Sequence, residues 1–415
     1  MNFGLFKNKI FIFSIVLVIT IGSLISYTFL FKPNNKIITT DSNNSFKICK
    51  LQLGGDLIST KYKNIIKNKN LGVLTNQTGV NSDGKHILDV LTENKDNNVV
   101  AIFSPKQNLN KKNNNELTYE SNHPKYNIPL YNIDNKNINL AENVMNNIDT
   151  FIVDIQDIGV RYHANVSTLY YFMETAKKYN KEIIVLDRPN PLGGSLVEGP
   201  VLEDSFKSFL GVDNLPIIHG MTIGELSNFF NRNIDCNLQV IKMEGYNRDM
   251  QWIDTDLEWI NHSDIPSIIS CFSYASTGLT DKISNIEMED YFTWFGSNNL
   301  DTKKLSNILE DSNIPGVSFA CENKGEKNGI KIIVNDYNTY NPLITGFYIL
   351  ASINSIIDLN LSKNNDKLNE FNKLMGNDKI SKMLADKRSA EDIINSYSKE
   401  LDNFKKEREK YLLYQ

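Results

Sequence analysis

Cysteine is scarce in this sequence. The 415 residues include four, at Cys49, Cys236, Cys271 and Cys321. They lie far apart and form no Cys-x-x-Cys pair, which excludes the spacing typical of a structural zinc site. We therefore predict no metal site and no cofactor. A disulfide stays open, because an oxidising compartment permits one but the spacing identifies no pair.

An excess of positive charge is also missing. Lysine and arginine number 44 against 49 aspartate and glutamate residues, which gives a net charge of -5. This balance gives no reason to expect a nucleic-acid partner. The fingerprint GxGxxG is absent after the first predicted strand, Leu71–Leu74, so we predict no dinucleotide site. The chain is nevertheless long enough to bury a large core and to exceed one ordinary domain.

Charge is absent altogether from the almost wholly apolar run Ile10–Phe31. A run of this length suits one membrane-spanning helix, and Lys7 and Lys9 before it favour a cytoplasmic N-terminus. A cleaved signal peptide is the alternative, but it needs a small-residue site, for which Ser26-Tyr27-Thr28 is a poor substitute. We predict an anchor within residues 1–31, with the bulk of the chain outside the cytoplasm. Secretion is the alternative.

A polar tether is predicted for residues 32–48, and an alternation of strands and helices follows it. The clearest unit runs from a strand at Phe151–Val153 through a helix at Ser167–Tyr179 to a strand at Ile183–Leu186. This order predicts a βαβ unit with a parallel strand pair. Further elements are predicted at Leu71–Leu74, His86–Thr92, Val99–Phe103, Ile128–Tyr131, Leu140–Asn147 and Leu238–Met243.

The fold class that follows is α/β, with two parts. Residues 49–250 are predicted to form a Rossmann-like domain around a mostly parallel sheet. The alternation weakens after about residue 250, so residues 251–415 are predicted to form a smaller α+β domain. An amphipathic helix at Glu391–Tyr414 is predicted to end it.

Polar side chains follow both strands of the βαβ unit. In an open parallel sheet the ligand lies beyond the carboxyl ends of the strands, so these side chains are expected to share one edge. Prolines and glycines in the second loop favour one fixed loop shape. The residues concerned are Asp154, Gln156, Asp157 and Arg161 after the first strand and Asp187, Arg188 and Asn190 after the second.

The motifs in this region are long and occur in a distinctive order. They are VDIQDIGVR, VLDRPNPLGG, VEGP at Val197–Pro200 and HGMTIGEL at His219–Leu226. The sequence thereby resembles the NamZ-type exo-β-N-acetylmuramidases, glycoside hydrolases that trim peptidoglycan fragments from the non-reducing end. The resemblance covers almost all of Leu51–Tyr414. It implies a Rossmann-like first domain, a hydrolase activity and peptidoglycan-derived sugars as partners.

One family motif is not retained. The family carries SPEHG after the second strand, whereas this chain has Ser104-Pro105-Lys106-Gln107-Asn108. Lys106 replaces the family glutamate and Gln107 the family histidine. Neither can act as a carboxylic acid, and glutamine cannot transfer a proton near neutral pH.

Glycoside hydrolysis usually needs two carboxyl groups, and candidates remain in the retained loops. Glu198 is the best remaining acid, and Asp154 and Asp157 are further catalytic candidates. Arg161 and Arg188 are expected to bind the lactyl carboxylate of a muramic acid, since guanidinium binds carboxylate in bidentate fashion. The structural alternative is that the two aspartates pair with these arginines and shape the loops.

Sugar contacts are expected from Asn76, Asp187, Asn190 and His219, although a lone histidine is usually structural. For Glu225 the structural role is favoured, because Thr222 followed by Glu225 is a capping box for a helix at Ile223–Phe230. Tryptophan faces often line sugar sites, but core packing is their commoner fate. The three tryptophans are Trp252, Trp259 and Trp294.

Three functions are compatible with these observations. The chain is an anchored exo-muramidase with a relocated acid, a non-catalytic module that binds cell-wall sugar or a partner protein, or a different hydrolase on the same scaffold. Loss of SPEHG beside retention of the DRPNP loop predicts a protein that binds a muramic-acid-containing ligand but hydrolyses it very slowly or not at all. No particular glycan is singled out.

Overall fold

The structure, a computed structural model, describes residues 38–40, 46–48, 50–105, 118–133, 142–261, 265–280, 283, 286–359, 361 and 364–415. The chain divides into two units, Met1–Cys49 and Lys50–Gln415. In the first, β1 (Ile38–Thr40) pairs antiparallel with β2 (Phe46–Ile48), within the predicted tether. The predicted span Ile10–Phe31 lies outside the described residues. Within those that are described, no helix has the length and apolar character to cross a bilayer.

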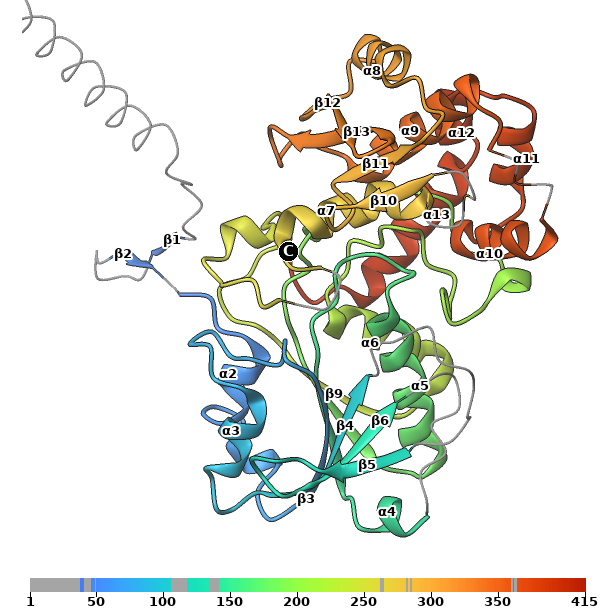
Figure 1. The fold of residues 1–415 in the computed structure, drawn as a ribbon. Helices are drawn as coiled ribbons and strands as arrows, with labels where there is room; N and C mark the ends of the chain where they lie inside the picture. Colours follow the sequence, from blue (N-terminus) through green and yellow to red (C-terminus); the bar gives the residue numbers. More distant parts are fainter. Residues whose placement is uncertain are drawn as a thin grey trace, which may run out of the picture. The chain divides into compact units, whose positions relative to one another are not determined.

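A seven-stranded sheet forms the base of the second unit (Figure 1), in the order β5-β6-β4-β3-β7-β8-β9. All neighbours are parallel except the edge strand β5, which runs antiparallel to β6. This confirms the predicted mostly parallel sheet. The strands are β3 (Asn70–Thr75), β4 (Asn98–Pro105), β5 (Thr118–Asn122), β6 (Pro129–Ile133), β7 (Thr150–Asp154), β8 (Glu182–Leu186) and β9 (Asn237–Ile241).

Both faces of this sheet are covered, which explains why its central strands are continuous apolar runs. Along β7, Phe151 and Val153 point into one apolar cluster and Ile152 into the other. Helices α2 (Gly54–Ile58) and α3 (Ile87–Thr92) lie on one side of the sheet, and α4 (Glu142–Asn146), α5 (Ala164–Lys178) and α6 (Ile223–Ile234) on the other (Figure 1). The β7-α5-β8 unit confirms the predicted βαβ motif.

A smaller antiparallel sheet, in the order β10-β11-β13-β12, lies in the C-terminal part. Its core is continuous with the α5 and α6 side of the large sheet. The predicted boundary near residue 250 stays a prediction. The strands are β10 (Glu287–Glu289), β11 (Trp294–Ser297), β12 (Val317–Lys324) and β13 (Lys327–Val334), and the helices are α7 (Ile268–Thr277), α8 (Thr302–Asp311), α9 (Pro342–Ile356), α10 (Asn365–Met375) and α11 (Lys379–Ala385).

The predicted single helix at Glu391–Tyr414 is wrong. The structure has α12 (Ala390–Asn395), α13 (Ser398–Arg408) and a 3-10 turn, Glu409–Tyr411. The break falls at Tyr397, whose side chain is buried and donates a hydrogen bond to Glu198. A long-range contact therefore overrides the helical period.

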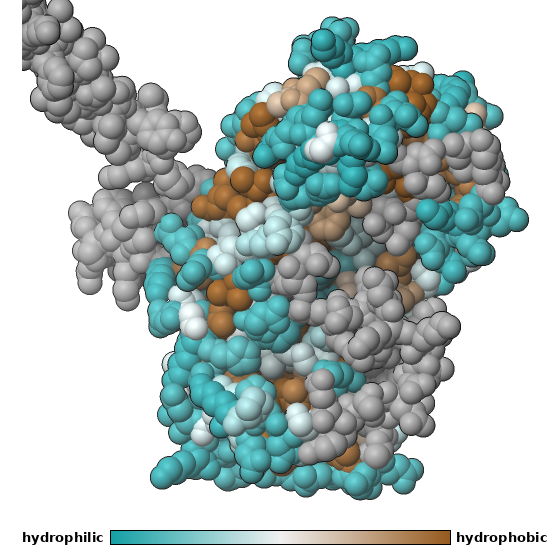
Figure 2. Space-filling model, in the orientation of Figure 1, coloured by the Kyte–Doolittle hydropathy of each residue, from teal (hydrophilic) through white to brown (hydrophobic). Residues whose placement is uncertain are grey.

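The exposed surface is consistent with a well-buried core. The face drawn in Figure 2 is mostly hydrophilic, with hydrophobic residues in several separate patches. Scattered apolar residues are normal on a soluble surface.

Candidate active site

A cavity of about 260 Å³ opens beside the carboxyl edge of the large sheet. It lies where the strand order reverses, since β3 has β4 on one side and β7 on the other. Ligands bind at such switch points in open α/β sheets. Its lining comes from the loops after β3, β7 and β8, from Leu53 and from an irregular segment before α7: Thr78, Val80, Asn81, Ser82, Asp83, Gly84, Gln156, Arg188, Trp252, Asp256, Leu257, Glu258, Trp259 and Ile260.

Arg188 is held rigidly at this cavity. Its Nε donates to Asp154 Oδ1 at 2.5 Å, and its Nη2 donates to the carbonyl of Val80 at 2.6 Å. Both charged side chains are almost fully buried, with 3% and 0% of the side-chain surface exposed. No hydrogen bond from Nη1 is found within the described residues, so one donor edge of the guanidinium remains for a ligand. Asp154 thus positions the arginine, which is the structural role considered for it.

Gln156 presents an acceptor at the same cavity. Its Nε2 donates to the carbonyls of Asp157 at 2.7 Å and Pro189 at 2.9 Å, which fixes the orientation of the amide. Its Oε1 is buried and accepts no hydrogen bond from any described residue. Because an unpaired buried acceptor is costly, Oε1 is suited to receive a hydrogen bond from a ligand.

Asn76 holds the loop after β3 in shape. Its Oδ1 accepts hydrogen bonds from the backbone N–H of Thr78 at 2.9 Å and from the Thr78 hydroxyl at 2.5 Å. The same hydroxyl accepts the backbone N–H of Gln156 at 3.0 Å, which ties this loop to the one after β7. Asn76 itself does not line the cavity.

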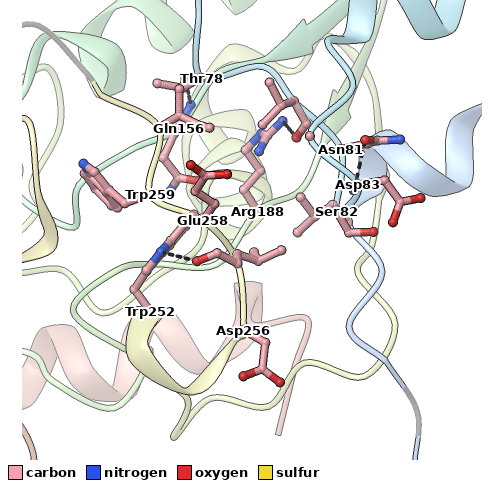
Figure 3. Close-up of a pocket in the computed structure, with 15 residues that line it drawn as sticks. Thr78, Asn81, Ser82, Asp83, Gln156, Arg188, Trp252, Asp256, Glu258 and Trp259 are labelled. Atoms are coloured by element: carbon pink, nitrogen blue, oxygen red, sulfur yellow. Dashed lines mark hydrogen bonds between the residues drawn. The ribbon is translucent and has the colours of Figure 1, made fainter.

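Two tryptophans form one wall (Figure 3). The rings of Trp252 and Trp259 meet edge to face with centroids 5.0 Å apart, and each indole N–H donates to a carbonyl, of Leu257 and Ile265 respectively. Their position is therefore fixed, and they offer apolar surface for a sugar face. Trp294 is fully buried, and its N–H donates to the carbonyl of Glu322.

Asp157 lies behind the cavity with two histidines. His219 Nε2 is 3.1 Å from Asp157 Oδ2 and His163 Nδ1 is 3.7 Å from Oδ1. Burial raises the pKa of Asp157, but the contacts with His163 and His219 outweigh burial and hold the pKa well below its usual range. His219 is fully buried, and its Nδ1 accepts the backbone N–H of Met221. Neither Asp157 nor His219 reaches the cavity.

Arg161 is fully buried away from the cavity. Its guanidinium donates to the carbonyls of Pro200, Leu215 and Leu374, at 3.1, 2.7 and 2.7 Å. Burial lowers its pKa to about 9. The predicted contact between Arg161 and a ligand carboxylate is therefore corrected: this arginine joins three chain segments. Asn190 is similarly buried, with its amide donating to the carbonyl of Met221.

Asp187 stabilises the start of α6. Its Oδ1 accepts the backbone N–H of Gly224 at 2.7 Å, and its Oδ2 accepts the hydroxyls of Thr222 at 2.9 Å and Tyr414 at 2.5 Å. Burial raises the pKa of Asp187 to about 7, although the hydrogen bond from Tyr414 opposes it. The predicted capping box of Thr222 and Glu225 is present. Asp187 is thus a structural residue rather than a sugar contact.

Glu198 is not at the cavity either. Its Oε1 accepts hydrogen bonds from the backbone N–H of Gly199 at 2.9 Å and the hydroxyl of Tyr397 at 3.1 Å, and its Oε2 accepts one from Asn341 at 3.2 Å. These donors come from the C-terminal part of the chain and from its own loop. Glu198 therefore connects its own loop to the C-terminal part of the chain. It does not face this cavity, where a scissile bond would lie.

Of the residues predicted to catalyse or to bind sugar, Arg188 alone lines the cavity, with Asp154 directly behind it. Gln156, which was expected at the same edge of the sheet, lines the cavity as well. Trp252 and Trp259 line it as well, although core packing had been the favoured expectation. Glu258 was not anticipated, because its segment has no periodicity from which a wall could be inferred. Among the described residues, no group of three or more histidine, cysteine, aspartate or glutamate side chains is arranged to hold a metal ion.

A parallel sheet with a rigid arginine, an unpaired amide acceptor and aromatic faces at its switch point is suited to an acidic sugar. The chain belongs to the exo-β-N-acetylmuramidase NamZ family: the N-terminal family model matches residues 71–268 and the C-terminal model residues 272–414. The resemblance seen in the sequence is thereby confirmed.

Similar individual proteins agree with this family assignment. The chain is 33% identical over 389 residues to the peptidoglycan beta-N-acetylmuramidase NamZ of Bacillus subtilis (strain 168), covering 90% of this chain and 93% of that protein. Two crystal structures of DUF1343 family proteins from Bacteroides fragilis NCTC 9343 are similar in fold. One has a TM-score of 0.81 at 28% identity and the other 0.65 at 25%, and each comparison covers 88% of this chain and 99% of the other.

Proposed function

We propose that this chain binds the muramic acid end of peptidoglycan-derived glycans in the cavity beside Arg188 and hydrolyses them very slowly. Membership of the exo-β-N-acetylmuramidase family supports the substrate class. The relative from Bacillus subtilis is a peptidoglycan beta-N-acetylmuramidase, which supports a peptidoglycan sugar in particular.

The proposal depends above all on the fixed orientation of the Arg188 guanidinium at the cavity. Its guanidinium is oriented by Asp154 and by the carbonyl of Val80, so little conformational entropy is lost when a ligand binds. The lactyl carboxylate of muramic acid is an anion that a guanidinium recognises well. Trp252 and Trp259 offer apolar faces for the sugar ring, and Gln156 Oε1 accepts a hydrogen bond from it.

Slow hydrolysis follows from the replaced motif. Lys106 and Gln107 stand where the family has glutamate and histidine, and both lie outside the described residues. A positioned acid or base contributes about 10²–10⁴-fold in rate. A lysine in place of the glutamate also adds positive charge, where an oxocarbenium-like transition state already develops one.

The test uses a chromogenic β-N-acetylmuramic acid glycoside and the full-length chain. We expect binding with little turnover, and a rise in turnover when Lys106→Glu and Gln107→His are combined. Arg188→Lys should weaken binding, because a lysine cannot reproduce the planar guanidinium. Absence of binding by the unaltered chain would show that the ligand is something else.

A cell-surface location is part of the proposal. The apolar run Ile10–Phe31 favours a single-pass anchor. A peptidoglycan substrate, which the family suggests, favours placing the bulk of the chain outside the cytoplasm. Cell fractionation with an intact mass tests this. A soluble product that begins near residue 29 would instead indicate a cleaved signal peptide.

A second candidate is a fully active hydrolase with a relocated acid. The observation in its favour is Glu258, a carboxylate that lines the cavity near Arg188 (Figure 3). Robust turnover by the unaltered chain, lost on Glu258→Gln, would favour this candidate over slow hydrolysis. Glu198→Gln is the matched control, because Glu198 is bonded elsewhere.

A further inference from the structure

The carboxylate of Asp187, the residue directly before Arg188, is fully buried and receives four hydrogen bonds. Its Oδ1 accepts the backbone N–H groups of Arg188 at 2.9 Å and Gly224 at 2.7 Å. Its Oδ2 accepts the hydroxyls of Thr222 at 2.9 Å and Tyr414 at 2.5 Å. A carboxylate offers about four lone-pair sites, so the acceptor capacity of Asp187 is filled.

The two hydroxyls are both committed to Asp187 as donors. The Tyr414 hydroxyl oxygen accepts the backbone N–H of Met243 at 2.8 Å, and the Thr222 hydroxyl oxygen accepts that of Glu225 at 3.2 Å. Each hydroxyl has a single proton to donate, and Asp187 Oδ2 is the acceptor that both of them meet. The hydrogen bonding therefore favours the ionised carboxylate.

Tyr414 is itself held in place by the residues on either side of it. The backbone N–H of Leu413 donates to Glu225 Oε1 at 2.8 Å. The carbonyl of Gln415 accepts the backbone N–H of Arg248 at 3.0 Å. Residues 413–415 are thus fixed on both sides of the Tyr414 ring, and the hydroxyl is presented to the loop after β8 in one position.

We propose that Tyr414 is a positioning residue, whose hydroxyl fixes the Asp187 carboxylate and through it the orientation of Arg188 toward the ligand. This inference rests on the proposed function, in which Arg188 binds the lactyl carboxylate of a muramic acid. Tyr414 does not line the cavity, so it acts through Asp187 and not by touching the sugar.

The effect is transmitted by the carboxylate group of Asp187. Loss of the Tyr414 hydroxyl leaves one of its lone-pair sites empty in the interior, and an unfilled buried acceptor is costly. Rotation of the carboxylate reduces that cost, but its two oxygens move together. The acceptor of the Arg188 backbone N–H therefore shifts, and the guanidinium leaves the geometry in which it meets Asp154 and the carbonyl of Val80.

The experiment compares the full-length chain with Tyr414→Phe, which removes the hydroxyl and keeps the ring. Calorimetry measures binding of the methyl β-glycoside of N-acetylmuramic acid at about pH 8, above the pKa of about 7 of Asp187. We expect binding to weaken about fivefold, since groups within one hydrogen-bond network are coupled to this extent.

Tyr397→Phe is the matched control. The Tyr397 hydroxyl also donates to a carboxylate, that of Glu198 at 3.1 Å, but Glu198 does not line the cavity. This variant should leave the sugar affinity unchanged. A second comparison uses Arg188→Lys, in which the guanidinium is absent. Adding Tyr414→Phe to Arg188→Lys should weaken binding about twofold or less, because the group that Tyr414 positions has already been removed.

Urea unfolding gives a further readout that needs no ligand. The losses in stability caused by Tyr414→Phe and Arg188→Lys should be less than additive when the two are combined, because both disturb one network. Additive losses would overturn the positioning role. A fivefold loss of binding that persists in the Arg188→Lys background would overturn it as well.

The outcomes separate this inference from the function beneath it. Unchanged binding by Tyr414→Phe, when the unaltered chain binds the sugar, would overturn the positioning role while the proposed function stands. If the unaltered chain binds no sugar, the proposed function fails, and the unfolding measurement alone decides whether Tyr414 orders Arg188.

Discussion

Removing the Arg188 guanidinium should destabilise the protein strongly. In Arg188→Met, Asp154 stays 1% exposed and loses the donor to its Oδ1, while its Oδ2 already has no donor among the described residues. The carbonyl of Val80 loses its donor too. Breaking a buried ion pair from one side typically costs about 3–5 kcal/mol of unfolding free energy, because a buried charge is left uncompensated.

A double variant separates this cost from simple loss of packing. Asp154→Leu combined with Arg188→Met removes both charges, and apolar replacements of a buried pair are often neutral in stability. We therefore expect the double variant to recover at least half of the free energy lost by Arg188→Met. Urea unfolding followed by circular dichroism measures all three proteins.

Two results would refute the reasoning about the buried Asp154–Arg188 pair. Arg188→Met within about 1 kcal/mol of the unaltered protein would mean that Asp154 is not left as an uncompensated buried charge. A double variant less stable than Arg188→Met would place the cost in packing instead. Either result would remove the argument that Asp154 holds the arginine ready for a ligand.

Three further predictions concern other parts of the molecule. Trp259→Ala should weaken sugar binding, measured by calorimetry, with a small effect on the free energy of unfolding. Trp294→Ala should instead lower the free energy of unfolding by about 3–5 kcal/mol, measured by urea unfolding, because it leaves a cavity in the core. Gly329→Ala should cost about 1–3 kcal/mol in urea unfolding, because its Cβ would overlap the indole of Trp294. Asp157→Asn should be less stable than the unaltered protein at pH 7. Because the folded pKa of Asp157 is depressed, its contribution is present above the unfolded pKa of about 4 and lost on acidification. The stability gap should therefore narrow as the pH falls below about 4.

Local patterns in the sequence were sufficient to predict the parallel sheet and the edge at which its polar loops lie. Short apolar runs ending in polar residues identified β3, β4, β7 and β8, and parallel pairing then brought Asp154 and Asp187 to one edge. The capping box of Thr222 and Glu225 was equally local, since its partners are three residues apart. Such features are predictable because each depends on neighbours along the chain.

The tertiary structure decided which polar side chains reach the cavity. Arg161 and Arg188 both follow strands of one βαβ unit, yet Arg161 donates to the carbonyl of Leu374, far along the chain, and is sealed off. Glu198 likewise meets Tyr397 from the C-terminal part. The direction of each side chain depends on which distant segment packs against its loop, and no local period encodes that.

The cavity wall formed by Trp252, Glu258 and Trp259 also could not be predicted from local sequence. Trp252, Glu258 and Trp259 lie in a segment without periodicity, and only the folded chain brings them opposite Arg188. The sequence alone determined the family, the parallel sheet and the edge at which the cavity lies, because motifs and strand patterns are local. The tertiary structure alone decided which groups line that cavity, because these depend on contacts between residues far apart in the chain.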